Sequence, residues 1–409
     1  KKNPELLSMM WHHGHNSAIV NGVPRIGYMK GGEKAKWSDI DMADKFLDEA
    51  KKYINKVFEN GKFTDGMFQK KCENLIKKKI KSKFVALTQN CSSALEIAIL
   101  LLNLKKGDEV IMPSYTFTST ANAVLLSGAK PVFADINLAD ANLDPNSVKK
   151  KINKNTKAII LVHYGGNSCD MDAFIKIKKK YKIVIIEDAA HGFLGKFKNK
   201  YLGTIGDFGA FSFHETKNFV GGQCGALSVN NVSFFNKVNI ILDKGTDRAI
   251  INNKKRYYSW KGIGSEFRSA ELPSALLFSQ LIKDQEIQSQ REKLWNFYFK
   301  NFNKIDSKEF TIFQKNKKNK SAYHVFSIIF KNFRMREKFI DFMKKKGIFC
   351  YFHYFPLHMS SFGKKFQKTK MTNTEKIYNG LVRLPLYPSL KINEQRRVII
   401  EAKKFLKLK

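Results

Sequence analysis

The sequence predicts an α/β fold, with a mostly parallel sheet in a large domain and a smaller α+β domain at the C-terminus. From about residue 84, short apolar runs alternate with segments of helical length, and this alternation is typical of βαβ units. After about residue 280 the pattern changes to a long amphipathic stretch followed by mixed strand and helix patterns. The 409 residues, 43% of them hydrophobic, suffice for one large or two moderate domains.

Five apolar runs in the first half read as buried strands. Between them lie segments of helical length, such as residues 92–104 and 118–128. Helices between parallel strands cover both faces of a sheet, and the binding crevice then lies at the carboxyl ends of the strands. The residues that come directly after each run are therefore the candidates for a site. The predicted strands are residues 84–87, 108–113, 130–136, 157–164 and 181–188.

The C-terminal part should begin with a long amphipathic helix over residues 279–302. A strand is expected at 324–330, a helix at 336–347, and a strand plus loop at 347–358. We therefore predict a large domain at 51–280 and a small one at 281–409. Residues 1–50 are rich in Gly and His, show no clear period, and are treated as an atypical segment.

The formal net charge of +37, from 73 Lys and Arg against 36 Asp and Glu, first suggests a nucleic-acid partner. Nearly all of this charge is lysine, however, and it is spread along the chain. Arginine, which is better suited to bidentate contacts with phosphates and bases, is scarce. We therefore expect a solvated basic surface and no nucleic-acid partner.

The five cysteines are widely spaced, odd in number and without a CxxC pair. This argues against a disulfide framework or a zinc site and favours a reducing, cytoplasmic setting. No apolar run approaches the ~18 residues of a membrane span, so no membrane partner is expected. Three histidines (His12, His13 and His15) lie close together near the start. They lack carboxylate or cysteine neighbours and are read as a polar loop, so no metal site is predicted.

Three strand ends carry polar residues that could do chemistry. The first is TQNCSSALEIAI, residues 88–99, where Ser93 and Glu96 have capping-box spacing ahead of an apolar helix. Together with Ser92, this helix start could bind a phosphate, because free N–H groups and the helix dipole favour anions. The alternative is an ordinary capped helix.

The second strand end is VIIEDAAHG, residues 184–192. Asp188 ends a buried strand, where a carboxylate needs a cationic or N–H partner, and His191 could share its crevice. The alternative is that Asp188 caps the next helix.

The third is FSFHETKN, residues 211–218. Lys217 lies between the strand GAFSF and the turn VGGQCG. A lysine in a crevice has a lowered pKa and can attack a carbonyl.

Together these parts suit pyridoxal phosphate. A phosphate cradle, an aromatic residue in PSYTF, a strand-end Asp and a loop Lys follow one another on one predicted sheet. Such groups can anchor the phosphate, stack on the ring, pair with the pyridine nitrogen and bind the aldehyde. No GxxxxGK[ST], no GxGxxG after a strand and no GxSxG motif occurs.

Several motifs resemble the DegT/DnrJ/EryC1/StrS family of sugar aminotransferases, which have the fold-type I architecture of pyridoxal-phosphate enzymes. The resemblance runs from about residue 55 to the C-terminus and is nearest to the dTDP-4-amino-4,6-dideoxygalactose transaminase group. The motifs are GDEVIMPSYTFTSTANAV, LVHYGGNSCDMD, IIEDAAHG, YLGTIGDFGAFSF, FSFHETKN, DKGTDR, YYSWKGIG, FHYFPLH and RLPLYPSL.

The resemblance implies roles for individual residues. Lys217 would bind the cofactor covalently and later move a proton, and Asp188 would pair with the pyridine nitrogen. His191 would lie near the cofactor's phenolic oxygen, and Phe117 would stack on its ring. The phosphate end would be held by Ser92, Ser93 and Ser212, with Cys91 also counted as cofactor-binding. The expected substrate-side residues are Trp260, His324, His353 and Tyr354.

The resemblance also implies a reaction. Glutamate would donate its amino group, and a nucleotide-linked 4-keto-6-deoxyhexose, carried on dTDP in the nearest group, would accept it for surface polysaccharide. Members form homodimers with active sites at the interface. Some relatives with His at the position of Lys217 are dehydratases, so Lys favours amino transfer.

The sequence departs from the family in three places. Glu266 stands where the family has Asn or Ser near the phosphate of the neighbouring subunit, and a carboxylate there would repel a phosphate. Pro273 replaces a usual helix former. Residues 1–50 resemble a piece of an arylsulfatase-like protein without the CxPxR nucleophile motif, which suggests a foreign fragment. These departures motivate an alternative, a catalytically inactive member that binds pyridoxal phosphate or nucleotide sugar as a regulator.

Overall fold

The computed structural model describes residues 18–20, 23–25, 41–248, 257–315, 318–367 and 369–407, with side chains from residue 48 onward. Its centre is a seven-stranded sheet in which only β11 runs antiparallel to its neighbours. The mostly parallel sheet expected from the strand–helix alternation is therefore confirmed. In sheet order the strands are β3 (Phe84–Thr88), β11 (Gly225–Val229), β10 (Phe208–Ser212), β7 (Val184–Asp188), β6 (Thr156–Val162), β4 (Glu109–Pro113) and β5 (Lys130–Ala134).

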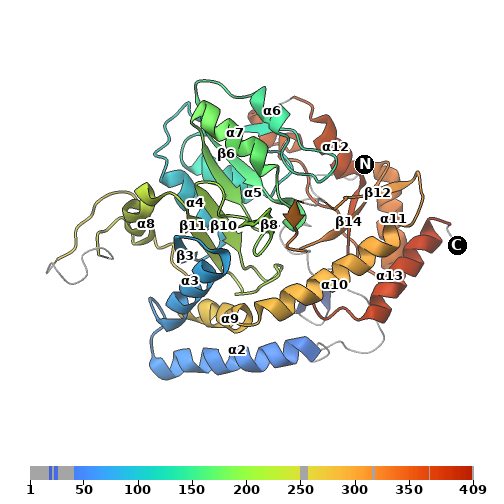
Figure 1. Ribbon diagram of the computed structural model, residues 1–409, viewed down its shortest axis with the longest axis horizontal. Helices are drawn as coiled ribbons and strands as arrows, with labels where there is room; N and C mark the ends of the chain where they lie inside the picture. The colour runs from blue at the N-terminus through green and yellow to red at the C-terminus, as the bar shows by residue number, and fades with distance from the viewer. Residues whose placement is uncertain are drawn as a thin grey trace.

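Helices cover both faces of this sheet (Figure 1). Because side chains alternate along a strand, Val110 and Met112 of β4 lie in one core and Ile111 between them lies in the other. One face carries α4 (Cys91–Leu100), α5 (Thr118–Leu126) and α8 (Phe235–Leu242). The other carries α3 (Met67–Ile80), α6 (Pro145–Lys149), α7 (Met171–Tyr181) and α9 (Glu271–Leu281).

Helix α2 (Asp41–Asn60) lies outside α9 along the lower edge of Figure 1. Tyr53 packs edge-on against Phe68 and Phe278, with ring centroids 5.6 and 5.1 Å away. This helix continues through residue 50, the expected end of the atypical segment. The short elements of the large part are β1 (Ala18–Val20), β2 (Val23–Arg25), η2 (Tyr164–Gly166), β8 (Lys196–Phe197), β9 (Lys200–Tyr201) and η3 (Val232–Phe234).

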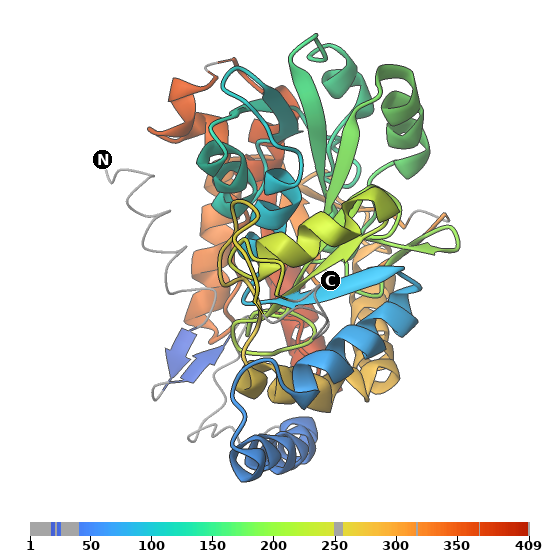
Figure 2. The same ribbon diagram turned by 90° about the vertical axis from the view of Figure 1, so that its left-hand side faces the viewer.

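The C-terminal part contains a three-stranded antiparallel sheet and lies behind the large sheet in the view of Figure 2. Its apolar core is separate from the cores of the large sheet, which supports, as a proposal, the division of the chain near residue 280. Its elements are α10 (Asp284–Phe302), β12 (Phe310–Ile312), β13 (Asn319–Lys320), β14 (Phe326–Phe330), α11 (Phe333–Lys345), η4 (Leu357–Met359), η5 (Gly363–Lys365), α12 (Thr372–Gly380), β15 (Leu381–Leu384) and α13 (Ile392–Phe405).

The prediction of a single helix over residues 279–302 is wrong, because the chain forms parts of two helices there. Helix α9 ends at Leu281, and Lys283 leaves helical geometry with φ −111° and ψ 23°. Asp284 and Glu286 lie in the first turn of α10, where acidic side chains suit the helix dipole. Asp284 also pairs with Lys79 of α3 at 2.6 Å, so the second helix is tied to the large sheet at its start.

The strand expected within residues 347–358 is also wrong. The segment forms isolated bridges instead of a strand, and Tyr351 bridges to β15 through both backbone hydrogen bonds with Arg383 (3.2 and 2.7 Å). Beyond it, Tyr354 leaves the sheet and packs with Tyr115 and Tyr164 in a buried aromatic cluster. Packing of these rings against the large sheet outweighs the local strand propensity.

Among the described helices, none is long and apolar enough to cross a membrane. All five cysteines are free, and four of them are buried. In the described residues no three His, Cys, Asp or Glu side chains are grouped to hold a metal ion. The predictions on His12, His13 and His15 and on the arylsulfatase-like resemblance of residues 1–50 fall largely or wholly outside the described residues, and stay predictions.

Candidate active site

The expected strand ends meet at one edge of the large sheet. Asp188 of β7 lies opposite Ala210 of β10, and two residues further on Ser212 pairs with Gly225. Gly225 in turn pairs with Thr88, the last residue of β3. The loops after β3, β7 and β10 therefore begin at the same edge of the sheet, as expected for parallel strands.

Lys217 lies in the loop between β10 and β11, which folds back on itself. The Lys217 N–H donates to the His214 carbonyl at 2.8 Å, and the side chain is half-buried. Burial lowers the pKa of Lys217 to about 8. The thiol of Cys91 and the carboxylate of Asp188 oppose this shift, and the charge of Arg383 adds to it. A larger share of this amine is neutral at physiological pH than of a solvated lysine, as a nucleophile requires.

Asp188 is held by a chain of hydroxyl groups. Thr116 Oγ1 lies 2.9 Å from Thr120 Oγ1, which donates to Asp188 Oδ2 at 2.9 Å, while Ala190 N donates to Oδ1 at 3.2 Å. Burial raises the pKa of this carboxyl, and these hydrogen bonds and Lys217 oppose the shift. No helix begins in described residues 189–195, so the reading of Asp188 as a helix cap is wrong. The carboxylate is instead held by these hydrogen bonds at the carboxyl end of β7.

The helix start expected to bind phosphate has a different cap from the one predicted. Helix α4 begins at Cys91, and the Asn90 side chain accepts from Ser93 N at 2.8 Å, so Asn90 rather than Ser93 is the N-cap. The first N–H groups of a helix have no partner within it. Ser92 Oγ donates to Ser119 Oγ at 2.7 Å, so this hydroxyl is fixed at the same end.

The opposite wall of this cradle comes from β11 and β10. A Cβ at Gly225 would lie only 2.4 Å from the Asn90 carbonyl carbon and 2.5 Å from Cys91 N. Strand and helix can approach this closely only because residue 225 is glycine. Ser212 at the end of β10 is 8% exposed, and its hydroxyl accepts from His214 N at 3.4 Å.

Phe117, expected to stack on a cofactor ring, precedes the first residue of α5 and is 41% exposed. It thus lies in the loop after β4, beside the hydroxyl chain that holds Asp188. A large aromatic ring left this accessible near a buried carboxylate can cover a planar ligand.

His191 and three of the four expected substrate-side residues form one buried ring cluster. His191 stacks on His324 with centroids 4.3 Å apart and on His353 at 5.7 Å. Gly165 N donates to His191 Nδ1 at 3.3 Å, so Nε2 carries the proton and faces the Tyr354 hydroxyl at 3.2 Å. Burial lowers the pKa of all three histidines well below its usual value.

Trp260, the fourth expected substrate-side residue, does not join this cluster. It lies between α8 and α9, is 81% exposed, and its Nε1 donates to the Gly262 carbonyl at 2.6 Å. Glu266 in the same segment forms an ion pair with Lys244, which neutralises the carboxylate. Pro273 is the third residue of α9, where its missing N–H is not needed by the helix.

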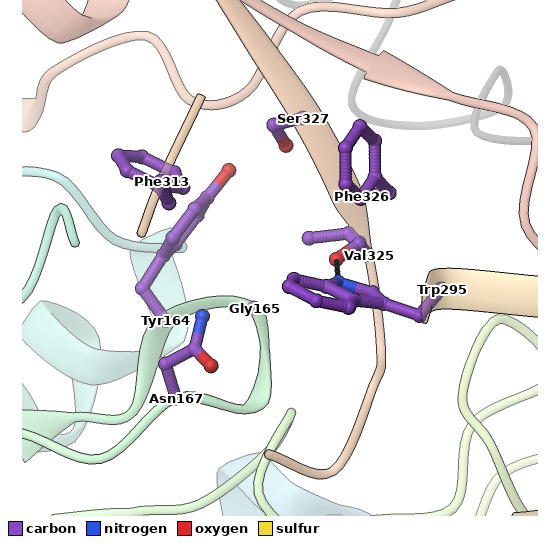
Figure 3. Close-up of a pocket in the computed structure, with 8 residues that line it drawn as sticks. All are labelled: Tyr164, Gly165, Asn167, Trp295, Phe313, Val325, Phe326 and Ser327. Atoms are coloured by element: carbon purple, nitrogen blue, oxygen red, sulfur yellow. Dashed lines mark hydrogen bonds between the residues drawn. The ribbon is translucent and has the colours of Figure 1, made fainter. Parts of the chain in front are cut away.

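Arg383, Tyr164, Thr120 and Asn218 are site residues that sequence reasoning missed. Asn218 comes directly after Lys217 and joins two chain segments, because its Nδ2 donates to Ala322 O at 2.7 Å and its Oδ1 accepts from His324 Nδ1 at 2.9 Å. Arg383 is 7% exposed in β15. A charge within the apolar run of this strand was the signal that could have found it. Figure 3 shows Tyr164 beside the strand that pairs with β15.

These residues fit pyridoxal phosphate, because an amine, a buried carboxylate, an exposed aromatic ring and a helix N-terminus all follow strands at one edge of the sheet. The fold and this donor set together define a pyridoxal-phosphate-dependent aminotransferase.

Comparison with known proteins gives the family. The model of the DegT/DnrJ/EryC1/StrS aminotransferase family matches residues 45–402, and the chain belongs to this family. It is 32% identical to the uncharacterized protein MJ1066 of Methanocaldococcus jannaschii over 86% of this chain and 94% of that protein. It is 29% identical to the GDP-perosamine synthase of Escherichia coli, over 86% and 94%.

A solved structure agrees with this assignment. Helicobacter pylori PseC, an aminotransferase involved in the biosynthesis of pseudoaminic acid, superposes with a TM-score of 0.81 at 26% identity, over 93% of this chain and 98% of that one.

Proposed function

We propose that this enzyme moves an amino group from glutamate to a nucleotide-linked 4-keto-6-deoxyhexose for surface polysaccharide. The observation that carries the proposal is the half-buried Lys217, with its lowered pKa, at the same sheet edge as Asp188 and the N-terminus of α4. When bound, pyridoxal phosphate supplies an aldehyde that takes up the amino group and a ring that withdraws electrons.

Each site residue would have a separate task. Lys217 would hold the cofactor through its amine and would also carry the proton that amino transfer requires. Asp188 holds a proton on the pyridine nitrogen, and Thr120 orients the carboxylate for it. The phosphate would be held by Cys91, Ser92, Ser93 and Ser212, while Phe117 would cover the ring and His191 would lie near the ring oxygen. His324, His353 and Tyr354 exclude water on the substrate side.

The nucleotide of the acceptor is part of the proposal. The nearest resemblance favours dTDP, whereas the name of GDP-perosamine synthase points to GDP for that relative. The protein should be incubated with pyridoxal phosphate, glutamate and dTDP-, UDP- and GDP-linked 4-keto sugars in turn, and products identified by mass spectrometry. Appearance of an amino sugar nucleotide supports the proposal. If protein whose absorbance shows bound cofactor yields no amino sugar with any 3-keto or 4-keto sugar nucleotide, the proposal is contradicted.

We also propose a cytoplasmic homodimer. The segment after α8 exposes large side chains on a single copy: Tyr257 is 73% exposed, Trp260 81% and Ile263 77%. Exposed apolar groups this close together suit a partner surface, and Trp260 could then complete the partner's substrate side. Light scattering on the native protein and on Trp260→Ala measures directly whether each forms a dimer.

The inactive-member alternative has lost one of its motives. Glu266 was expected to repel a phosphate, but its ion pair with Lys244 leaves no isolated negative charge there. The other motive, the atypical segment 1–50, lies largely outside the described residues, and the aminotransferase remains the function that we propose.

A further inference from the structure

Sequence reasoning expected a solvated basic surface because the lysines are spread along the chain, but the fold gathers many of them at one edge. The parallel strands of the large sheet begin at the edge opposite the candidate active site, which we call the amino edge. The segments that lead into β3, β4, β5, β6 and β7 all reach this edge, and they contain many lysines and no arginine. Their exposed lysines are Lys77, Lys78, Lys81, Lys83, Lys105, Lys106, Lys130, Lys149, Lys150, Lys154, Lys157, Lys179, Lys180 and Lys182.

Neighbouring loops of the amino edge are bonded to one another. Glu109 N donates to the Asn155 carbonyl at 2.9 Å, which joins the starts of β4 and β6. Lys130 N donates to the Asp108 carbonyl at 2.9 Å, which adds the start of β5. Helices α6 and α7 lie side by side toward the top of Figure 1, and both end at this edge. With strands ~4.8 Å apart, the edge from β7 to β5 spans roughly 15 Å, so these lysines form one basic surface.

The acidic side chains of these segments, Asp108 and Glu109, do not balance the lysines, because both are already paired. The ion pairs at this edge are Lys157 with Asp108 at 3.6 Å, Lys130 with Glu109 at 3.5 Å, Lys178 with Asp207 at 2.6 Å and Lys79 with Asp284 at 2.6 Å. The other exposed lysines of the amino edge form no ion pair within the part of the chain that the structure describes. The edge therefore keeps a large positive surplus.

Helix dipoles account for only part of this charge. Lys77, Lys149 and Lys179 lie in the last turns of α3, α6 and α7, where cations are favoured. Lys106 and Lys154 lie in the loops beyond α4 and α6, outside the turn over which a helix dipole acts. Like charges gathered on one surface repel one another, and an anionic surface laid against the amino edge would relieve this repulsion.

Large apolar side chains are exposed among these lysines. Leu126, the last residue of α5, is 74% exposed, and Val232 at the start of η3 is 59% exposed. Because β11 runs against its neighbours, it ends where they begin, and Val232 just beyond it lies near the same edge. Tyr181 between Lys180 and Lys182 is 38% exposed, and Lys180 Nζ lies 5.2 Å from its ring centroid. Aliphatic and tyrosine side chains beside lysines are typical of surfaces that bind at a membrane–water interface.

We propose that the amino edge binds the surface of an anionic lipid bilayer. The lysines attract the anionic headgroups, and Leu126, Val232 and Tyr181 enter the interfacial layer. Such a contact needs no spanning helix, whereas the prediction of no membrane partner rests on the lack of an apolar run of spanning length. A nucleic acid fits this surface less well, because phosphates offer nothing to the apolar side chains and the edge lacks the arginine that reads bases.

This orientation leaves the candidate active site accessible. Asp188 and the N-terminus of α4 lie at the carboxyl edge, and strands of five residues place that edge roughly 16 Å from the amino edge. The segment with Trp260, proposed above as a dimer contact, lies on the carboxyl side as well, because Arg268 shortly after it bridges to Thr88 at the end of β3. The bilayer contact would therefore block neither the entry of a nucleotide sugar nor the dimer.

The test measures by flotation how the whole protein partitions onto vesicles of three parts phosphatidylcholine and one part phosphatidylglycerol at physiological salt. An amino-edge variant changes four exposed lysines of three neighbouring loops and should lower the partition coefficient roughly ten-fold or more. It carries Lys105→Gln, Lys106→Gln, Lys154→Gln and Lys179→Gln. The matched control loses the same charge at exposed positions of α11 and α12 and should bind like the native protein. It carries Lys338→Gln, Lys344→Gln, Lys345→Gln and Lys376→Gln.

A substitution at Leu126 separates a bilayer from a nucleic acid. Leu126→Gln keeps every charge but removes an apolar side chain that would leave water on binding. It should lower the partition coefficient onto the mixed vesicles several-fold and leave the Kd for duplex DNA unchanged. Equal partition of Leu126→Gln and the native protein would contradict insertion of this side chain and the proposed bilayer contact.

Three other results would overturn the inference. They are a native protein that does not float with the mixed vesicles, one that floats equally well with pure phosphatidylcholine, and equal binding by the two lysine variants. Binding to duplex DNA but not to vesicles, lost in the amino-edge variant, would assign this edge to nucleic acid instead. The amino-edge variant should load pyridoxal phosphate and transfer amino groups like the native protein, so this inference and the proposed function fail separately. Thermal unfolding checks that each variant is folded.

Discussion

Lys217 differs from the other lysines of this basic chain in its surroundings. Burial and the charge of Arg383 favour the neutral amine, whereas Asp188 and Cys91 favour the protonated one. The balance leaves the pKa at about 8, against about 10.4 for a solvated lysine. The amine can therefore react near physiological pH, and selectivity among lysines results from desolvation at one strand edge.

This balance predicts a pH dependence for cofactor capture. Cofactor-free protein should take up pyridoxal phosphate at a rate that rises with pH and is half-maximal near the Lys217 pKa of about 8, because only the neutral amine attacks. Stopped-flow absorbance between pH 6.5 and 9.5 measures this rate. A rate that is still rising steeply at pH 9.5 would show that the reacting lysine is an ordinary solvated one.

Asp188 allows a second prediction. Asp188→Asn keeps the shape and can still accept from Thr120 Oγ1, but it removes the negative charge that would hold a proton on the pyridine nitrogen. We expect kcat to fall roughly 100-fold, the scale of losing one electrostatic contact in an active site, while cofactor absorbance is largely kept. In Thr120→Val, which keeps the carboxylate of Asp188 but not its orientation, kcat should fall less. Equal activity of Asp188→Asn and native protein contradicts this role.

The sequence predicted the site residues that stand directly after strands and missed those that come from other elements. Asp188, Ser212 and Lys217 lie at or just beyond the ends of buried runs, so local pattern alone placed them at one edge. Thr120 reaches the site from the first turn of α5, and Arg383 comes from the small sheet. Their proximity depends on tertiary packing that no local spacing encodes.

At the scale of elements, we propose that the N-terminus of helix α4 binds the cofactor phosphate, and Asn90 caps this N-terminus. The side chain of Asn90 accepts from Ser93 N, so the first turn begins at a fixed residue. The sequence instead favoured Ser93 as the cap because its spacing to Glu96 matches a capping box. Both readings predict a helix, and only the geometry shows which residue begins it.

Asn90→Ala should therefore cost about 1 kcal/mol in the free energy of unfolding and also weaken phosphate binding, raising the Kd for pyridoxal phosphate roughly five-fold. Asn332→Ala is the matched control, since Asn332 caps α11 in the same way by accepting from Met335 N at 2.9 Å. It should cost similar stability and leave the cofactor Kd unchanged. Urea unfolding and cofactor titration measure both quantities. If the two substitutions change the cofactor Kd equally, the N-terminus of α4 is not part of the phosphate site.

A second feature at this scale is a set of hydrogen bonds that joins the C-terminal part to the loop that carries Phe117. Ser114 Oγ accepts from His358 N at 3.0 Å and donates to His358 Nδ1 at 2.7 Å, so His358 Nε2 carries the proton toward Glu375 Oε1 at 3.4 Å. Ser114 is fully buried, so this arrangement orients the loop and offers no nucleophile. The strand predicted here from the apolar run 347–358 was wrong for the same reason: long-range contacts of these rings decide the local geometry.

At the scale of the whole molecule, the protein folds around histidines that are kept neutral. Burial lowers the pKa of His191, His324, His353 and His358. The unfolded chain, with His near 6.5, binds more protons than the folded one below that pH. By linkage, stability then rises with pH and is lost on acidification.

Cofactor-free protein should thus lose stability between pH 7.5 and 5.5, by roughly 1 kcal/mol for each of these histidines. Urea unfolding at several pH values gives the slope of the free energy of unfolding against pH, and His353→Gln should make this slope smaller. Stability that stays constant or increases over this range would mean that these histidines are protonated in the folded state. The net charge of +37 acts in the same direction through self-repulsion.

The measurement that tests the central claim most directly is the position of the covalent bond to the cofactor. Protein loaded with pyridoxal phosphate should be reduced with borohydride, digested and sequenced by mass spectrometry, with Lys217→Ala in parallel. We predict a pyridoxyl group on the peptide that contains Lys217, and neither this adduct nor the visible absorbance in Lys217→Ala. An adduct on another lysine, or absorbance that persists in Lys217→Ala, would contradict the account.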